Sequence, residues 1–291
     1  MGVADLVPGV SGGTIALITG IYAELVESIK SIDSNSLKTL RRDGIAEAWR
    51  TINGTWLATL ISGMLTSVVL LAGLIDYLIT AHGLSLWSFF SGVIGASAIL
   101  LLRRYRPTAW HHWFLFVCGI HASLALSISP PLALQDSYTS LFFAGSVAFC
   151  AMILPGLSGT LILVALGLYP TIIAALADFQ VDLLAVFGGG GILGLLLFSR
   201  LMSWLMREHQ IALMVTMCGF LIGSLTLVWP WRYSPEPASD STSPATVINL
   251  LPEQYAALAE IDPATTECLV FASLGLFLAA GFDHVSHRLE V

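Results

Sequence analysis

Pro8-Gly9-Val10-Ser11-Gly12-Gly13-Thr14, near the start of the chain, recurs in shortened form as Pro155-Gly156-Leu157-Ser158-Gly159-Thr160. We call these stretches the first and the second Pro-Gly motif. Proline lacks the amide donor that a helix interior needs, and glycine favours turns, so each motif is expected to break a helix. Apolar residues surround both motifs. The sequence therefore predicts two irregular segments inside an otherwise apolar and helical protein.

The similarity between the two parts of the chain continues beyond the motifs. Gly20-Ile21-Tyr22 matches Gly167-Leu168-Tyr169 at the same offset from the motif. Further on, Gly92 and Ser97 match Gly219 and Ser224 when the polar stretch Ser31–Asn53 is treated as an insertion in the first copy. Because chance is a poor explanation for such a series, we expect two copies of one unit, residues 1–130 and residues 131–291.

Composition identifies the solvent of this protein as lipid. Hydrophobic residues make up 56% of the 291 residues and charged residues only 11%, against roughly 25% in an ordinary soluble domain. The mean hydropathy is +0.83. Apolar runs approach the roughly 20 residues that cross a bilayer. These values predict a multi-pass membrane protein. The net charge of -7 gives no indication of the basic surface that nucleic-acid binding requires.

Six apolar segments are expected to span the membrane in addition to the two broken ones. They are 56–81, 86–102 and 113–128 in the first copy and 183–206, 211–229 and 268–282 in the second. Three crossings between the copies make them antiparallel, which is the inverted-repeat architecture of many secondary transporters. The expected fold is therefore all-α and polytopic, with a re-entrant helical hairpin in each copy, at 5–29 and at 140–177. In the second hairpin the arms are 141–154 and 161–176.

The basic residues give an orientation for these segments. If the first hairpin enters from the cytoplasm, eleven of the twelve Lys and Arg lie on or toward the cytoplasmic side and only Arg232 lies outside. The mouth of the second hairpin carries Asp136, Asp178 and Asp182 and no basic residue. The insertion 31–53 is then a cytoplasmic amphipathic segment at the headgroups. The proline-containing stretch 233–263 is then an external loop.

The restart of a helix after each motif is the candidate binding site. Unpaired amides of a first helical turn, together with the positive end of the helix dipole, attract anions, and phosphate in particular. Hydroxyl groups beside the glycines would add donors. The alternative is that these small residues serve close helix packing, which repetition in two antiparallel copies makes less favourable. The predicted phosphate ligands are Ser11, Gly12, Gly13, Thr14, Ser158, Gly159 and Thr160, and the helix breaks are Pro8, Gly9, Pro155 and Gly156.

A few other polar residues lie at membrane depth. Arg200 follows a run of apolar residues and is expected either to pair with the anion or to extend toward the cytoplasmic surface. Asp5, Glu24, Tyr22 and Tyr169 are candidates for a coupling or a structural role. The four cysteines lie singly in apolar runs, so neither a metal nor another cofactor is expected.

The run Ala4–Thr14, with Gly20-Ile21-Tyr22 after it, resembles the bacterial PopT family of undecaprenyl phosphate translocases, as do Met152–Thr160, Phe198–Leu201 and Gly219–Ser224. The resemblance covers nearly the whole chain. It implies a multi-pass protein of the bacterial cytoplasmic membrane that returns the C55 lipid carrier to the cytoplasmic leaflet for cell-wall synthesis. Its partners would be undecaprenyl phosphate and membrane lipids. Family members carry an apolar stretch before the first motif, so the first hairpin is expected here to lack most of its entering arm.

Two alternatives to a lipid transporter remain open at this point. An intramembrane lipid pyrophosphatase also has inverted repeats and a Pro-Gly-x-Ser turn, but its turn continues with Arg-Ser, whereas these motifs continue with glycine and threonine. An anion channel or transporter would also use an anion site at mid-membrane. A proton, a sodium ion or the membrane potential are each compatible with the cycle of a transporter.

Overall fold

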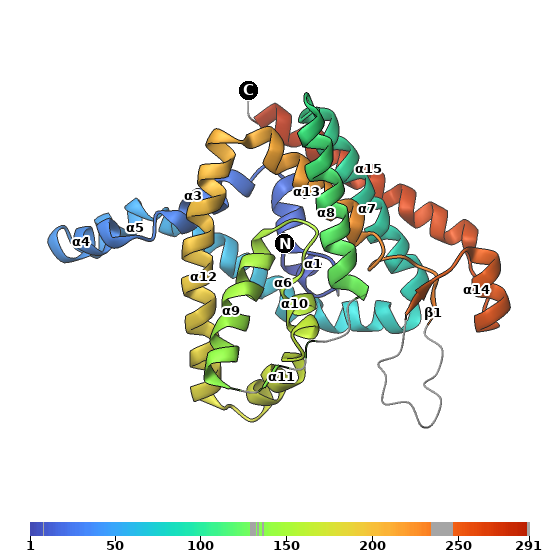
Figure 1. Cartoon of the computed structure of the whole chain (residues 1–291), viewed down its shortest axis with the longest axis horizontal. Coiled ribbons are helices and arrows are strands. Elements are labelled where there is room, and N and C mark those ends of the chain that lie inside the picture. Colours follow the sequence, from blue (N-terminus) through green and yellow to red (C-terminus); the bar gives the residue numbers. More distant parts are fainter. Residues whose placement is uncertain (8, 129–131, 133, 136, 234–246, 290–291) are drawn as a thin grey trace.

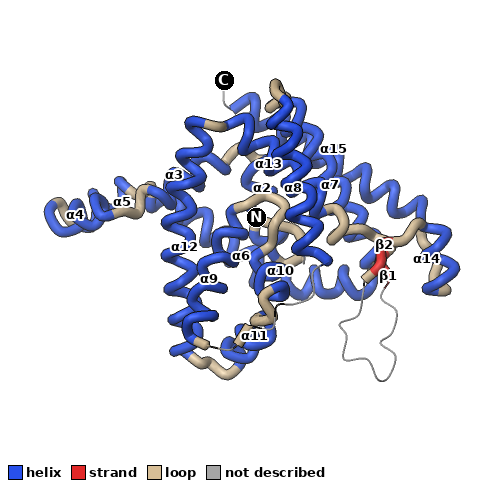
Figure 2. Tube along the Cα trace, in the orientation of Figure 1, coloured by secondary structure: helices blue, strands red, loops and turns tan. Residues whose placement is uncertain are grey.

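Long runs of Leu, Val, Ala and Gly without proline form helices along most of the chain in the computed structural model (Figure 1). The structure describes residues 1–7, 9–128, 132, 134–135, 137–233 and 247–289. Pro8 and residues 234–246 of the expected external loop lie outside the described residues. The single sheet in the described part is one short antiparallel ladder, in which β1 (Arg232–Tyr233) pairs with β2 (Ile248–Asn249) (Figure 2). The protein is therefore all-α, as predicted.

The helices follow the chain in two similar series. The first is α1 (Gly2–Asp5), α2 (Gly12–Ile18), α3 (Tyr22–Lys30), α4 (Ser34–Arg42), α5 (Ile45–Thr51), α6 (Gly54–Ala81), α7 (Gly83–Arg104) and α8 (Trp110–Ile128). The second is α9 (Tyr138–Ile153), α10 (Gly159–Ala165), α11 (Tyr169–Ala177), α12 (Val181–Glu208), α13 (Gln210–Ser224), α14 (Pro252–Ala259) and α15 (Thr265–Leu289). The six predicted spans correspond in position to α6, α7, α8, α12, α13 and α15, but α13 ends at Ser224 and is shorter than the predicted segment 211–229.

Length and composition make this a multi-pass membrane protein. Within the described residues, α6, α7, α12 and α15 are long and apolar enough to cross a membrane, and two bent helix pairs raise the number of candidate spans to six. Helix α6 leaves apolar side chains such as Leu65, Val69 and Leu70 exposed along its length. Such an outward apolar face is expected when the surrounding solvent is lipid.

Both bent pairs turn at the glycine that the two copies share. The chain bends by 116° between α2 and α3 and by 113° between α10 and α11. Gly20 and Gly167 stand at the turns with φ of 77° and 76°, a left-handed conformation that ends helices and favours glycine. The second arm of the predicted hairpin, 161–176, is therefore not one straight helix, which corrects the sequence interpretation. The turn recurs at matched positions, as a repeat requires.

Glycines also set the closest helix contacts. A Cβ on Gly92 of α7 would lie 2.0 Å from the Ala272 carbonyl oxygen of α15. A Cβ on Gly219 of α13 would lie 2.3 Å from the Phe116 carbonyl oxygen of α8. Since Gly92 and Gly219 match in the repeat, equivalent helices pack in equivalent pairs, α7 with α15 and α13 with α8. That the two copies are related by inversion stays a prediction.

The insertion 31–53 folds into two helices that project sideways from the body (Figure 1). Asp33 caps α4 by accepting hydrogen bonds from the Asn35 and Ser36 amides, both at 2.8 Å. Exposed apolar side chains line this arm, as an amphipathic segment at the membrane surface requires. They include Leu37, Ile45 and Trp49.

The predicted external loop is more ordered than the sequence suggests. Its described part contains β2 and the helix α14, where an irregular loop was expected. Pro252 stands in the first turn of α14, a position that proline favours, and Gln254 accepts a hydrogen bond from the Leu251 amide. A local capping arrangement of this kind explains why a proline-containing stretch still forms a helix.

Candidate functional site

The first Pro-Gly motif docks directly onto the second through its hydroxyl groups. Thr14 Oγ1 accepts a hydrogen bond from the amide of Gly156 at 3.2 Å. Ser11 Oγ lies 3.4 Å from the carbonyl oxygens of Met152 and Leu154, to which it donates. Gly13 makes this approach feasible, because a Cβ there would lie 2.6 Å from the Ile153 carbonyl oxygen. The structure thus joins the two predicted breaks, which are far apart in the sequence.

Glycine is required at the turn of each motif. Gly9 and Gly156 have φ of 84° and 80°, values that other residues rarely adopt. Gly156 is also confined, since a Cβ would lie 2.7 Å from the Leu221 amide nitrogen of α13. Pro155 before it is fully buried. The breaks therefore arise from the backbone chemistry that the sequence indicates.

A cavity of about 180 Å³ opens where the motifs meet, and we call it the motif cavity. Its polar wall comes from both copies: Asp5, Ser11, Ser158, Gly159 and Thr160. The rest of its wall is apolar, formed by Ala148, Phe149, Met152, Leu163 and Phe187. Five of the residues singled out in the sequence thus share one small space. Gly12, Gly13 and Thr14 adjoin it through the helix that Ser11 begins.

The two helix starts at the motif cavity differ in their partners. At α2, Asp5 Oδ1 accepts from the Gly12 amide at 2.7 Å and Ser11 Oγ accepts from the Gly13 amide at 3.2 Å. Asp5 thus occupies the place in front of α2 that the sequence assigns to an anion. The structure describes the whole of α10, and there the Ser158 side chain makes no capping hydrogen bond to the first amides of the helix. Its hydroxyl lies 2.6 Å from the Thr160 hydroxyl instead. The start of α10 is therefore the more open of the two.

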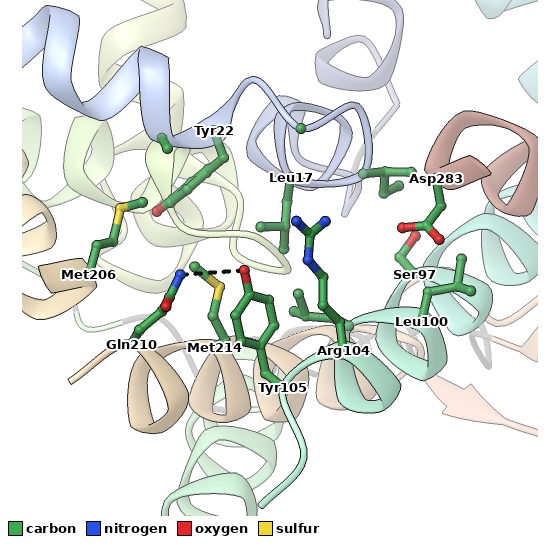
Figure 3. A pocket seen from close by; sticks show the side chains of 14 residues that line it. Leu17, Tyr22, Ser97, Leu100, Arg104, Tyr105, Met206, Gln210, Met214 and Asp283 are labelled. Carbon is green, nitrogen blue, oxygen red and sulfur yellow. Dashed lines mark hydrogen bonds between the residues drawn. The ribbon is translucent and has the colours of Figure 1, made fainter. Parts of the chain in front are cut away.

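The remaining candidates of the first copy lie at the other end of α2. Tyr22 is buried, with 2% of its surface exposed, and lines a second cavity (Figure 3). Glu24 Oε1 accepts a hydrogen bond from Asn53 Nδ2 at 3.0 Å, which links α3 to the start of α6. Tyr169, the counterpart of Tyr22, begins α11 and is 38% exposed. The structure therefore does not bring Glu24, Tyr22 or Tyr169 to the motif cavity.

Arg200 does not reach the motif cavity either. Its Nη1 donates to the Leu196 carbonyl oxygen of its own helix at 2.7 Å, and the side chain borders the groove between α12 and the arm α4–α5. The side chain therefore lies beside the arm and not at the motif cavity. Pairing of Arg200 with the anion stays a prediction that this arrangement does not support.

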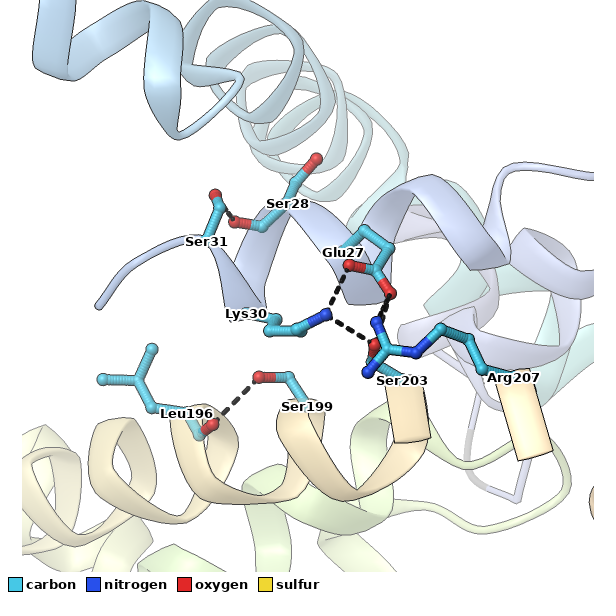
Figure 4. A network of polar contacts seen from close by, with 8 residues as sticks. All are labelled: Glu27, Ser28, Lys30, Ser31, Leu196, Ser199, Ser203 and Arg207. Carbon is cyan, nitrogen blue, oxygen red and sulfur yellow. Dashed lines mark hydrogen bonds and ion pairs between the residues drawn. The ribbon is translucent and has the colours of Figure 1, made fainter. Parts of the chain in front are cut away.

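A polar network that the sequence interpretation missed joins α3 to α12 (Figure 4). Glu27 receives hydrogen bonds from Ser203 and from Lys30, the latter at 2.9 Å, and Arg207 lies 3.8 Å away. Lys30 Nζ also donates to Ser203 Oγ at 2.8 Å. The spacing of Glu27 and Lys30 by three residues was the available signal, because such pairs share a helix face. Their partners on α12 follow only from the fold.

The sequence of this chain is similar to those of known proteins. A family model described as undecaprenyl phosphate translocase-like matches residues 1–245. A polyprenyl-phosphate transporter of Vibrio cholerae is 36% identical over 99% of this chain and 94% of its own length. A polyprenyl-phosphate transporter of Staphylococcus aureus is 31% identical over 79% of this chain and 83% of its own length. No solved structure matches the chain.

Proposed function

We propose, because this chain belongs to the undecaprenyl phosphate translocase-like family, that it carries a polyprenyl phosphate across the bacterial cytoplasmic membrane. The observation that supports this most is the motif cavity. There the Ser11 hydroxyl of the first copy lies near the Ser158 and Thr160 hydroxyls at the start of α10, inside a helical membrane protein. Undecaprenyl phosphate, returned to the cytoplasmic leaflet for cell-wall synthesis, is the substrate that the family description favours.

The headgroup would bind at the start of α10. The hydroxyls of Ser158 and Thr160 and the first amides of that helix are donors suited to phosphate oxygens. A cavity of about 180 Å³ accommodates a phosphate group but not a C55 chain. The tail therefore remains in lipid, while Phe149, Met152 and Phe187 provide an apolar wall beside the headgroup.

Asp5 would make binding reversible. It is the one ionisable side chain in the wall of the motif cavity, and it already bonds the Gly12 amide at 2.7 Å. A phosphate and an ionised Asp5 repel each other in such a small space, so the headgroup binds well only when Asp5 is protonated or moves away. On this proposal Asp5 is the coupling residue, the proton is the coupling ion, and release of the headgroup lets the carboxylate return to Gly12.

Transport rather than hydrolysis fits the chemistry of this cavity. Its described wall contains no His, Cys, Lys or Arg that would activate a nucleophile or stabilise the charge of a pentavalent phosphate. The relatives are named transporters. We therefore propose that the phosphate ester leaves the protein intact.

The direct test is movement of undecaprenyl phosphate in proteoliposomes that contain the purified protein. Wild type is expected to accelerate movement between leaflets without releasing inorganic phosphate. The double variant Ser158→Ala/Thr160→Val is expected to slow transport at least tenfold, because each hydroxyl would contribute a hydrogen bond to a charged group, roughly 1.5–3 kcal/mol. Asp5→Asn is expected to bind the lipid more tightly and to lose the dependence of transport on a proton gradient.

A matched control uses two hydroxyls that face lipid. Thr59 and Ser62 lie exposed on α6 and donate only to carbonyls of their own helix, at 2.8 and 2.9 Å. Thr59→Val/Ser62→Ala should transport like wild type. Absence of transport by folded wild type would reject the function, and release of free phosphate would instead favour the pyrophosphatase.

A further inference from the structure

A second polar cavity lies at the opposite end of α2 from the motif cavity, and we call it the Tyr22 cavity (Figure 3). It has a volume of about 110 Å³. Helices α2, α3, α7, α12, α13 and α15 contribute to its wall. The residues that matter for its chemistry are Gly20, Tyr22, Arg104, Tyr105, Gln210 and Asp283. A seven-residue helix separates the two cavities, a distance of about 10 Å.

Tyr22 supplies the strongest sign that this cavity holds a ligand. Only 2% of the residue is exposed, and among the described residues its hydroxyl has no hydrogen-bond partner. The side chain points into the cavity, toward Met206 and Gln210 (Figure 3). A buried hydroxyl without a partner is unfavourable, so native proteins rarely keep one. A ligand that accepts a hydrogen bond from Tyr22 would remove this cost.

The start of α3 adds a second group of donors. The left-handed turn at Gly20 redirects the chain by 116°, so that α3 begins at the cavity with Tyr22 and Ala23 in its wall. This helix is nine residues long, and the structure describes all of them. No side chain caps its first turn. Its first amides and the positive end of its dipole therefore lie beside the cavity that Gly20, Tyr22 and Ala23 line.

The opposite wall carries a cation and further polar groups. Gln210 Nε2 donates to Tyr105 Oη at 3.4 Å, which leaves the Tyr105 hydroxyl proton for another acceptor. The Arg104 guanidinium lies 5.8 Å from the centre of the Tyr105 ring. In Figure 3, Arg104 extends into the cavity between Tyr105 and Asp283. Donors and one guanidinium thus share a largely apolar wall, in which Asp283 is the one carboxylate among the lining residues.

We propose that the Tyr22 cavity is a second site for a phosphate monoester, separate from the motif cavity. Phosphate oxygens would accept from Tyr22, Tyr105 and the amides of α3, while Arg104 offsets the charge. Asp283 would select for a protonated phosphate, because a carboxylate accepts a hydrogen bond from P–OH but repels an anion that has no proton to donate. Sulfate, which carries no proton near neutral pH, is therefore excluded.

The second copy has lost the equivalent site. There Tyr169 begins α11 and is 38% exposed, so its hydroxyl has access to the surroundings. Pro170 follows it at the position of Ala23, and proline has no amide to offer. The occupant is assigned as a lipid headgroup on the basis of the proposed function, and free phosphate would satisfy the same groups.

The test measures binding to the detergent-solubilised, full-length protein by isothermal titration calorimetry. The probes are farnesyl phosphate, inorganic phosphate and sulfate. To remove the motif cavity from the measurement, titrations are repeated in the Ser158→Ala/Thr160→Val variant. In the double variant, where only the Tyr22 cavity remains, we expect Tyr22→Phe to weaken farnesyl phosphate binding about tenfold. Tyr169→Phe, the matched control, should change it less than twofold, and sulfate should not bind.

Melting temperatures separate a lost ligand contact from a lost fold. Without ligand, Tyr22→Phe should melt at or above the wild-type temperature, since it removes an unpaired buried hydroxyl. With farnesyl phosphate, wild type should gain more stability than the variant. Tighter binding of farnesyl phosphate than of inorganic phosphate identifies a lipid headgroup site, and equal binding identifies a free phosphate site.

Unchanged binding by Tyr22→Phe, or binding of sulfate as tight as that of phosphate, would overturn the assignment. Transport of undecaprenyl phosphate by wild type is measured separately. If transport is present and Tyr22→Phe binds normally, only the second site is rejected. If wild type does not transport, the proposed function is rejected whatever the titrations give.

Discussion

The hydroxyl of Thr14 accepts a hydrogen bond at 3.2 Å from the amide of Gly156, a residue 142 positions later in the chain. This contact fastens the start of α2 to the turn that precedes α10. Both groups are buried. Around it, Ser11 reaches the carbonyl groups at the end of α9. The motif cavity therefore depends on a small number of bonds between the two copies.

Thr14→Val is expected to destabilise the protein while keeping the shape of the side chain. The substitution leaves the buried Gly156 amide without its acceptor, at a cost of about 1–3 kcal/mol. Thermal unfolding in detergent would measure the loss. The control is Thr160→Val, whose hydroxyl bonds only the Ser158 hydroxyl on the exposed side. That variant should keep its stability, and equal melting temperatures for the two would argue against the docking contact.

Two glycines on α7 offer a matched test of the helix packing. Gly92→Ala places a methyl group 2.0 Å from the Ala272 carbonyl oxygen and should destabilise by roughly 1–3 kcal/mol or more. Gly95→Ala meets nothing within 4 Å and should be neutral or stabilising by up to about 1 kcal/mol. Unfolding in detergent would compare them. If both variants match wild type, α7 and α15 do not pack as described.

Ser203 and Ser199 distinguish the network between α3 and α12 from ordinary helix packing. Ser203→Ala removes the hydroxyl that contacts both Glu27 and Lys30 and should lower stability by about 1 kcal/mol. Ser199→Ala removes a hydroxyl that donates only to Leu196 of its own helix, and its effect should stay within about 0.5 kcal/mol. The measurement is thermal unfolding at low and high salt. A network of charges predicts that the difference between the variants shrinks as salt increases.

Sidedness can be tested with single cysteines in a variant that lacks the four natural ones. Ser34→Cys on α4 should react with an impermeant maleimide only from the cytoplasmic side, and Glu253→Cys on α14 only from outside. Reaction of both positions from the same side would reject an odd number of crossings between them. The inverted arrangement of the two copies depends on that number.

The sequence predicts the helices better than the contacts between them. Each of the six predicted spans contains a helix because its apolar run is long and free of proline, but α13 ends at Ser224, five residues before the predicted end. The motif breaks follow from Gly9 and Gly156, whose positive φ only glycine adopts easily. The bends at Gly20 and Gly167 have the same cause, yet the pattern of apolar residues runs through them without interruption. Periodicity alone therefore suggested a straight arm.

Site residues divide in the same way. Ser11, Ser158 and Thr160 belong to the motifs and line the motif cavity, and their role as phosphate ligands stays a prediction. Arg200 was assigned from its apolar surroundings alone, but its side chain follows its own helix. The groups around Tyr22 come from six helices that share no motif. A set of that kind becomes visible only when the helices are packed.

The close packing of α7 against α15 also has a consequence for how the protein is made. Ser85 on α7 donates to Glu267 on α15, a residue 182 positions later. At about 5–20 residues per second, roughly ten seconds or more of translation separate the insertion of α7 from the synthesis of its partner. During that interval lipid or an insertion factor must cover the face of α7 that carries Gly92 and Ser85. Assembly of the helix bundle is therefore a late event, completed only when the C-terminal span has left the ribosome.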